Sequence, residues 1–437
     1  MSQPPDPAEH AAAVRAWAAH LAAGGTSPWR EWRTGTDRTD RTATDRTATG
    51  VVAPTPTLPG AAQLEAVRRL ALRRPAAYDR ERFARIAARV LATPGPGRGL
   101  PHLPVLPLDP TTGEPLPPVS AIGARPVDPG RVPVEELLRV LTGVLPALLA
   151  TAAPHVRRPE PEVRATPGRR TARPVRFRVV GPPAASETVR AALLAAGHHE
   201  GGPGERVVVL GLPVEAMLAE AWGIRVSRGS ATRWHRFVAQ WTEQQLLVSM
   251  NLPALARHHL TPAPAGLRSR LRGLFGGAPA APAPVVVLAE TVEDLLPRVA
   301  DALGLPDLAP APTAPRGLDA EAADLLRRVH RIAGISLPPA RGEDATAAAL
   351  ALLTRPGARP RVGAPASFRP RIEQLAARLA DQLTDDAAAG RYAVAGDPAV
   401  LGIRPRVGSA APDLGVVLER GVDLVLAAVA ATPEERS

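Results

Sequence analysis

Two pairs of adjacent histidines are the residues of this chain whose types invite a metal site. His198 and His199 are followed by Glu200, and His258 and His259 form the second pair. A zinc site needs ligands that converge on one point, and neighbouring side chains on a helix or a strand point apart. No His-Glu-x-x-His motif occurs, and no carboxylate has ligand spacing to the second pair. We therefore predict solvated loop histidines, no metal ion and no cofactor.

Two glycine turns lie where an α/β sheet would hold an anion, because each follows an apolar strand and precedes a helix. They read VVGPPAASE and VLGLPVE, and neither matches Gly-x-Gly-x-x-Gly. Prolines remove backbone donors from both turns, and Glu187 and Glu215 at the helix starts repel phosphate. We interpret Gly181 and Gly211 as residues that only turn the chain, with nucleotide binding as the alternative.

A mixture of guanidinium and indole groups around Trp234 gives a candidate anion-binding site. The arginines near Trp234 are Arg225, Arg228, Arg233 and Arg236. Two polar residues, Ser186 at a predicted helix start and Asp397 after a predicted strand, complete the candidate site. We expect Ser186 to be the N-cap of a helix over 187–196. The alternative interpretation, which we prefer, is an amphipathic helix that buries Trp234 and Trp241 on one side.

A second arginine group is a candidate for contact with nucleic acid. Its residues are Arg157, Arg158, Arg169, Arg170 and Arg173. Phosphate backbones attract such segments through counterion release. The group has no aromatic interleaving and no signature of a DNA-binding or RNA-binding fold, so we favour a proline-rich linker over a nucleic-acid site.

The absence of two residue types excludes several kinds of catalysis. The chain contains no cysteine and no lysine, so all 53 residues counted as lysine or arginine are arginine. Thiol catalysis, a Walker-type phosphate lysine and a Schiff base with pyridoxal phosphate are therefore excluded. No nucleophile motif surrounds any serine. Asp385 and Asp386 are expected at a polar helix end, without the burial that tunes a carboxyl pKa for proton transfer, and no catalytic residue is predicted.

Composition indicates a high-G+C bacterial genome. One asparagine and two tyrosines stand against 51 prolines and 37 glycines, and the net charge is +11. Much of the arginine excess then reflects codon usage, although a positive charge still favours anionic partners. The start, MSQPPDPAEH, lacks the features of a signal peptide. The apolar stretch Val140–Ala153 is interrupted by Gly143 and Pro146 and indicates a buried helix. We expect a cytoplasmic protein without membrane contact.

Periodicity predicts an α/β fold with helical regions at both ends. Helices are expected over 8–23, 61–73, 79–92, from Pro133 to about Leu149, and over 318–332, 344–353, 369–383 and 414–430. The buried side of the helix over 61–73 should consist of Leu64, Val67, Leu70 and Leu72. The helix over 8–23 should be covered by Trp29 and Trp32. The middle alternates strands and helices, with strands at 176–180, 206–210 and 285–288 and shorter pieces at 224–226 and 392–395. These predict a small, open, mostly parallel sheet with flanking helices.

The same patterns divide the chain into seven segments. They are 1–33, an N-terminal helix and tryptophan motif; 34–57, a disordered low-complexity linker; 58–152, a helical region with a proline-rich loop; 153–174, an Arg/Pro-rich linker; 175–305, the α/β core domain; 306–317, a proline-rich linker; and 318–437, a mainly helical C-terminal region. The low-complexity linker repeats Asp-Arg-Thr and has too little apolar surface to order itself.

Four segments resemble an uncharacterised family of actinobacterial proteins. They are HLAAGGTSPWREW at 20–32, LPGAAQLEAVRRL at 58–70, VRFRVVGPP at 175–183 and YAVAGDPAVL at 392–401. The resemblance implies a cytoplasmic location and carries over no catalytic residue.

These observations favour a non-enzymatic binding or scaffolding protein with a protein partner. A transferase-like enzyme on a degenerate nucleotide-binding sheet is the second hypothesis, and weak, non-specific nucleic-acid binding through arginine-rich segments is the third. A cleft at the carboxyl ends of the strands, lined by arginine and Asp397, would favour the transferase. Exposed apolar helix faces would favour a protein partner.

Overall fold

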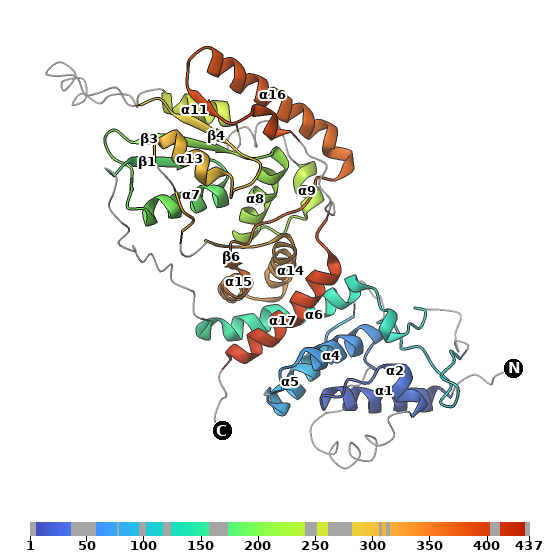
Figure 1. Ribbon diagram of the computed structural model, residues 1–437. Coiled ribbons are helices and arrows are strands. Elements are labelled where there is room, and N and C mark those ends of the chain that lie inside the picture. Colours follow the sequence, from blue (N-terminus) through green and yellow to red (C-terminus); the bar gives the residue numbers. More distant parts are fainter. Residues whose placement is uncertain are drawn as a thin grey trace. The chain divides into compact units, whose positions relative to one another are not determined.

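The computed structural model forms an α/β fold in two compact units (Figure 1). Unit 1 comprises residues 1–158, 328–352 and 413–437, and unit 2 comprises residues 159–327 and 353–412. The structure describes residues 6–35, 58–76, 78–95, 102–116, 124–156, 174–240, 251–260, 282–305, 308–311, 315–402 and 411–432. The predicted linker 34–57 therefore lies, apart from its first two residues, outside the described residues.

Unit 1 is built from helices. They are α1 (Pro7–Ala22), α2 (Trp29–Thr34), α4 (Ala61–Arg73), α5 (Arg80–Leu91), α6 (Val134–Ala152), most of α15 (Pro339–Leu353), the second half of α14 (Ala320–Ser336), and α17 (Leu414–Ala431). The predicted C-terminal region, residues 318–437, contributes to both units, since α14 begins in unit 2.

The predicted aromatic cover on the first helix is confirmed. Asp6 caps α1 by accepting a hydrogen bond from the backbone N–H of Ala8. The ring centroids of Trp17 and Trp29 are 5.1 Å apart, and Trp32 stacks on Trp29 at 5.8 Å. All three indoles are buried, so this motif belongs to the core of unit 1.

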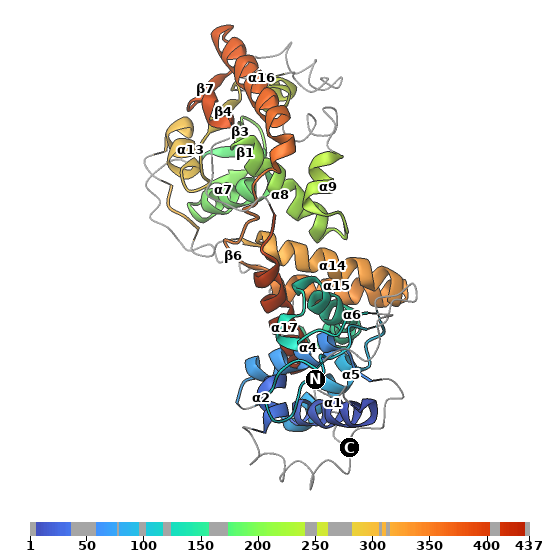
Figure 2. The ribbon, with the colours of Figure 1, turned by 90° about the vertical axis from the view of Figure 1, so that its right-hand side faces the viewer.

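Helices α4, α6 and α17 form the centre of unit 1, and α6 lies beside α17 in both views (Figure 1 and Figure 2). Leu64, Val67 and Leu70 of α4 are fully buried, as predicted. The prediction for Leu72 is wrong, because 55% of this residue is exposed. It lies two residues after the buried Leu70. At 3.6 residues per turn this places Leu72 on the opposite side of α4 from the face that Leu64, Val67 and Leu70 bury.

One helical stretch among the described residues, Val134–His155, is long and apolar enough to cross a membrane by length and composition. Two-thirds of its most apolar window is buried inside the protein. The buried side chains include Leu137, Leu141 and Leu145, which are fully covered. This agrees with the predicted buried helix around Val140–Ala153.

Unit 2 contains a five-stranded parallel sheet. The strands are β1 (Arg176–Val180), β2 (His199–Glu200), β3 (Arg206–Gly211), β4 (Val285–Leu288) and β7 (Ala393–Ala395), and their spatial order is β2-β1-β3-β4-β7. Val208 of β3 pairs with Val285 of β4, and Val285 pairs with Ala393 of β7. After Arg206, strand β3 is apolar and buried, and β4 is apolar, as expected for central strands with helices on both sides of the sheet. Strand β1 carries the exposed Arg176 and Arg178, and β2 is exposed. The predicted addition of 392–395 to the sheet is confirmed, and Figure 2 shows β7 beside β4.

Helices cover both faces of this sheet. On one face lie α7 (Pro183–Ala195) and α13 (Leu295–Leu303), which contact each other, and on the other lie α11 (Leu252–Leu260) and α16 (Arg369–Ala388) (Figure 1). Two further helices, α8 (Val214–Ser227) and α9 (Trp234–Ala239), follow β3. A short antiparallel pair, β5 (Arg316–Gly317) and β6 (Arg355–Pro356), completes the unit.

Three local predictions for unit 2 are wrong. Ile224–Val226 is helical and belongs to the end of α8. His199 and Glu200 form strand β2, because their backbones pair with the start of β1. Ser186 is not an N-cap: α7 begins at Pro183, so the serine lies inside the first turn. A proline at the first helical position marks this start better than the serine does.

Candidate functional site

The candidate site is the carboxyl edge of the sheet between β1 and β3. In a sheet of this order the chain leaves these two neighbouring strands in opposite directions, and ligands of doubly wound proteins bind at such a switch point. Helix α7 begins directly after β1, through Gly181 and Pro182. Gly181 has φ +142°, and a Cβ there would lie 2.6 Å from the carbonyl oxygen of Leu210. Glycine thus allows this turn to press against β3.

The start of α7 is occupied by a carboxylate of the chain itself. Pro182 provides no side-chain cap, and Pro183 has no N–H. Glu220 of α8 accepts hydrogen bonds at Oε2 from the backbone N–H groups of Ala184, at 3.1 Å, and Ala185, at 3.4 Å. These are the free donors that hold phosphate in nucleotide-binding folds. Because Glu220 is 4% exposed, it fills the position as a buried internal anion.

A segment over residues 359–364 covers α8. Nη2 of Arg359 donates to the hydroxyl of Thr188 in α7 at 2.9 Å. Nε1 of Trp234 donates to the carbonyl oxygen of Gly363 at 2.8 Å, and the backbone N–H of Ala364 donates to Glu215. Since α8 contacts α7 on one face of the sheet and α16 on the other, these contacts close the switch point from several sides.

The buried Glu220 and the half-buried Arg359 carry charges of opposite sign. Burial raises the pKa of Glu220, and the nearby positive charge of Arg359 and the two backbone donors act in the opposite direction. Burial also lowers the pKa of Arg359, which the negative charges of Glu220 and Glu293 oppose. Glu220 and Arg359 therefore favour each other's charged forms within unit 2.

The structure does not bring the predicted anion-binding residues together. Ser186 lies beside β1, whereas Asp397 follows β7 and caps a short 3₁₀ turn by accepting from the backbone N–H of Ala399 at 2.9 Å. Strands β3 and β4 lie between β1 and β7. At about 4.8 Å between neighbouring strands, β1 and β7 are about 14 Å apart. Ser186 and Asp397 therefore do not serve one small ligand.

The Ser186 hydroxyl is buried and has no hydrogen-bond partner in the structure. We expect Ser186→Ala to increase the free energy of unfolding by about 0.5 kcal/mol, because alanine is a better helix former and removes an unpaired polar group. Chemical denaturation followed by circular dichroism measures this change. A loss of more than about 1 kcal/mol would show instead that the hydroxyl has a partner.

The four arginines around Trp234 belong to the exposed side of an aromatic cluster. The Trp222 and Trp234 rings are 5.7 Å apart, and Phe237 stacks on Trp234 at 6.1 Å. Arg225 lies 6.0 Å from the Phe237 ring. The four side chains, all exposed, are Arg225, Arg228, Arg233 and Arg236. The preferred interpretation is correct for Trp234, which is buried, and Trp241 lies outside the described residues.

The histidine pairs differ from the prediction of solvated loop residues. His198 is 7% exposed and accepts at Nδ1 from the backbone N–H of Val175 at 3.3 Å. Burial lowers the pKa of His198, so it serves as a neutral acceptor. His258 and His259 lie in the last turn of α11, with ring centroids 5.2 Å apart. No group of three or more potential ligands suited to a metal ion occurs among the described residues.

The prediction that Asp386 lies unburied at a polar helix end is also wrong, because its carboxylate is only 1% exposed. It accepts from Nε and Nη2 of Arg257 at 2.7 and 2.9 Å and from the hydroxyl of Tyr392 at 2.6 Å, and it pairs with Arg391. Burial would raise the pKa of Asp386, but these hydrogen bonds outweigh it and hold the pKa at about 2. An acid this strong stays ionised and joins α11, α16 and the start of β7, so its role is structural.

Comparison with protein-family models, with curated proteins and with solved structures finds no match. The resemblance to an actinobacterial family therefore stays a prediction, and so does the cytoplasmic location. The five arginines predicted to contact nucleic acid, Arg157, Arg158, Arg169, Arg170 and Arg173, lie outside the described residues.

Proposed function

We propose that this protein is a non-enzymatic binding or scaffolding protein. The observation that carries the proposal is the Glu220 carboxylate on the first turn of α7. A doubly wound enzyme keeps this place open for its substrate or cofactor, and here a buried side chain fills it. The transferase hypothesis requires an open cleft at the same edge of the sheet.

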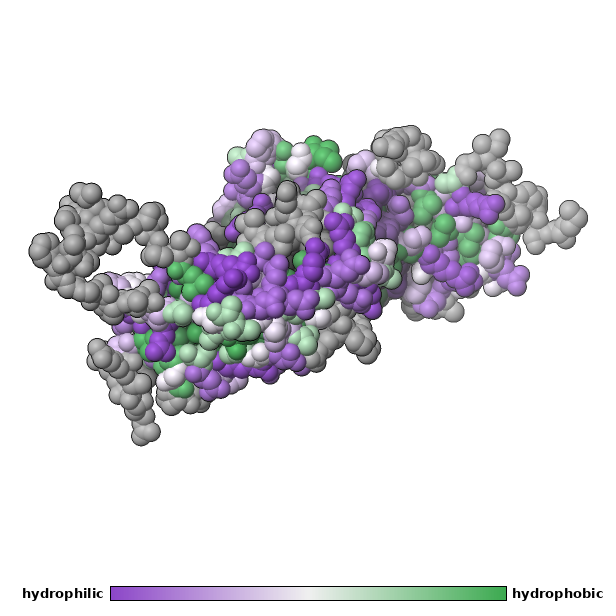
Figure 3. Space-filling model, turned by 90° about the horizontal axis from the view of Figure 1, so that it is seen from above, coloured by the Kyte–Doolittle hydropathy of each residue, from purple (hydrophilic) through white to green (hydrophobic). Residues whose placement is uncertain are grey.

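The surface hollows support the same proposal. Two hollows among the described residues are lined by residues of unit 1 and not by the carboxyl edge of the sheet in unit 2. The face in Figure 3 mixes hydrophilic and hydrophobic residues, and its hydrophobic residues gather in small separate groups.

Exposed apolar side chains on unit 1 favour a protein partner over a small substrate. The large exposed apolar residues of the described chain are Leu58, Leu72, Ile335 and Val416. Three of them lie on helices, and Ile335 is 80% exposed. Scattered apolar residues are common on soluble proteins, so these residues support the proposal without carrying it.

Hydrogen–deuterium exchange tests the proposal at the site itself. We expect exchange of the Ala184 and Ala185 amides to stay unchanged when ATP, NAD or a nucleotide sugar is added at millimolar concentration, because Glu220 already holds both amides. Peptides covering 181–190 report this position. Slower exchange there with any one of these compounds, and not elsewhere in unit 2, would favour the transferase hypothesis.

A further inference from the structure

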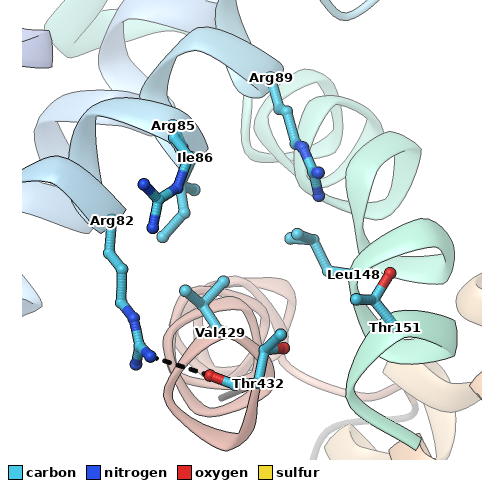
Figure 4. Close-up of a pocket in the computed structure, with 8 residues that line it drawn as sticks. All are labelled: Arg82, Arg85, Ile86, Arg89, Leu148, Thr151, Val429 and Thr432. Atoms are coloured by element: carbon cyan, nitrogen blue, oxygen red, sulfur yellow. Dashed lines mark hydrogen bonds between the residues drawn. The ribbon is translucent and has the colours of Figure 1, made fainter. Parts of the chain in front are cut away.

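Three arginines of α5 line a hollow between α5, α6 and α17 (Figure 4). Spacings of three and four residues place Arg82, Arg85 and Arg89 along one side of the helix. The rest of the lining consists of Ile86, Leu148, Thr151, Val429 and Thr432. All eight residues belong to unit 1.

The charge around this hollow is positive. None of the eight lining residues is acidic. Arg82 donates to the carbonyl oxygen of Thr432, where α17 ends, at 3.0 Å. Arg85 pairs with Glu81 at 3.1 Å, and because both side chains are more than half exposed, this pair is weak. Among the described residues, Arg89 has no ion pair, and its side chain extends toward Leu148 and Thr151 (Figure 4).

The size and the walls of the hollow limit what it can hold. About 120 Å³ of it is accessible to water-sized molecules, which leaves room for a tetrahedral oxyanion. Ile86, Leu148 and Val429 line the hollow beside the arginines, so one wall is apolar and suits a hydrocarbon group next to the anion.

We propose that this hollow binds the phosphoryl group of a small, soluble phosphate monoester. A phosphoryl group carries a charge of about −1.5 to −2 and three acceptor oxygens. Arginine matches such oxygens with paired N–H donors, and three arginines approach from one helix. A carboxylate has only two oxygens and one charge, so it uses fewer of these donors. The ester substituent packs on Ile86, Leu148 and Val429.

This inference is independent of the proposed function. The hollow is in unit 1, whereas the proposed function depends on Glu220 in unit 2. Binding of phosphate in the hollow therefore does not alter exchange at the start of α7, and either proposal can fail alone.

Isothermal titration calorimetry of the full chain with phenyl phosphate, inorganic phosphate and benzoate tests the proposal. We expect phenyl phosphate to bind more tightly than either of the other two, since it alone offers both the dianion and an apolar group. Arg89→Gln should weaken phenyl phosphate binding by roughly tenfold or more, as one charge-assisted hydrogen bond is lost. Arg80→Gln is the matched control, because Arg80 is on the same helix but does not line the hollow.

Two further measurements make the outcome decisive. Glu434 and Glu435 follow Thr432 in the sequence, and a variant with glutamine at both positions measures phosphate binding by a chain with two fewer negative charges. Absence of phenyl phosphate binding in both the parent protein and this variant would overturn the proposal, as would equal losses in Arg89→Gln and Arg80→Gln. Binding to phosphatidic acid vesicles without binding of phenyl phosphate would overturn the assignment to a small soluble ester.

Discussion

Replacing Asp386 by alanine is expected to lower the free energy of unfolding of unit 2 by about 3 kcal/mol. The substitution removes a buried carboxylate that accepts four hydrogen bonds from Arg257, Arg391 and Tyr392. The Tyr392 hydroxyl is then left buried without its acceptor. Arg257 no longer ties α11 to α16, so amide exchange over Leu252–Leu260 should accelerate more than exchange elsewhere in the unit.

Asp385→Ala is the matched control for this variant. Asp385 is the preceding residue of the same helix and is exposed, so its loss should change the free energy of unfolding by no more than about 0.5 kcal/mol. Equal effects of the two substitutions would contradict the structural role of Asp386.

The same carboxylate makes unit 2 sensitive to acid. Its pKa is about 2 in the folded protein and 3.8 as the ordinary value. A group whose pKa is lower in the folded state stabilises the fold above its ordinary pKa, and this stabilisation is lost as the pH falls toward the folded value. The parent protein should therefore lose about 2 kcal/mol between pH 4 and pH 2 through this group. In Asp386→Ala that part of the pH dependence should be absent.

The sheet could be predicted from sequence because its strands carry their signal locally. The segments 207–210 and 285–288 are continuous apolar runs, which are typical of buried parallel strands. The segment 176–180 alternates arginine with phenylalanine and valine and is rich in β-branched residues towards its end. The two-residue strand β2 has no such signal, since His199 and Glu200 pair only through their backbones. Ile224 and Val226 are apolar and β-branched, but their segment is the end of helix α8.

The groups that fill the switch point could not be predicted in the same way. The two prolines of GPPAAS indicate a poor phosphate site, and in the structure Glu220 accepts from the backbone donors that remain at Ala184 and Ala185. Nothing near Glu220 in the sequence marks it as the acceptor for α7, because 35 residues separate it from Ala185. Arg359 lies still further along the chain. The only signal is indirect: a helix that begins with Pro-Pro and has no side-chain cap needs an acceptor from elsewhere.

The burial of Asp386 could not be predicted from the neighbouring sequence either. Its neighbours in the sequence are polar, so the pattern predicts an exposed helix end. The partners that bury it come from Arg257, 129 residues away, and from the segment that enters β7. A carboxylate pair in a polar helix end is therefore not by itself a sign of exposure.

Replacing Glu220 by alanine is expected to lower the free energy of unfolding of unit 2 by about 2–3 kcal/mol. The alanine leaves the buried N–H groups of Ala184 and Ala185 without an acceptor, and it leaves Arg359 without its strongest buried counter-charge. Glu220→Gln should cost less, about 1 kcal/mol, because its amide oxygen still accepts from the helix and only the counter-charge of Arg359 is lost. Calorimetry of the three proteins measures the difference.

Glu187→Ala is the matched control, since this glutamate is also near the start of α7 but is exposed and pairs with Arg190 at 2.7 Å. It should change the free energy of unfolding by about 0.5 kcal/mol or less.

The Glu220→Ala protein also tests whether the carboxylate keeps other anions away from the start of α7. If Glu220 acts as an internal anion, its removal should let inorganic phosphate slow amide exchange at Ala184 and Ala185, because the same donors become available. If phosphate does not affect amide exchange at Ala184 and Ala185, and the free energy of unfolding is unchanged, then Glu220 does not hold the start of α7. Other groups would then close the switch point.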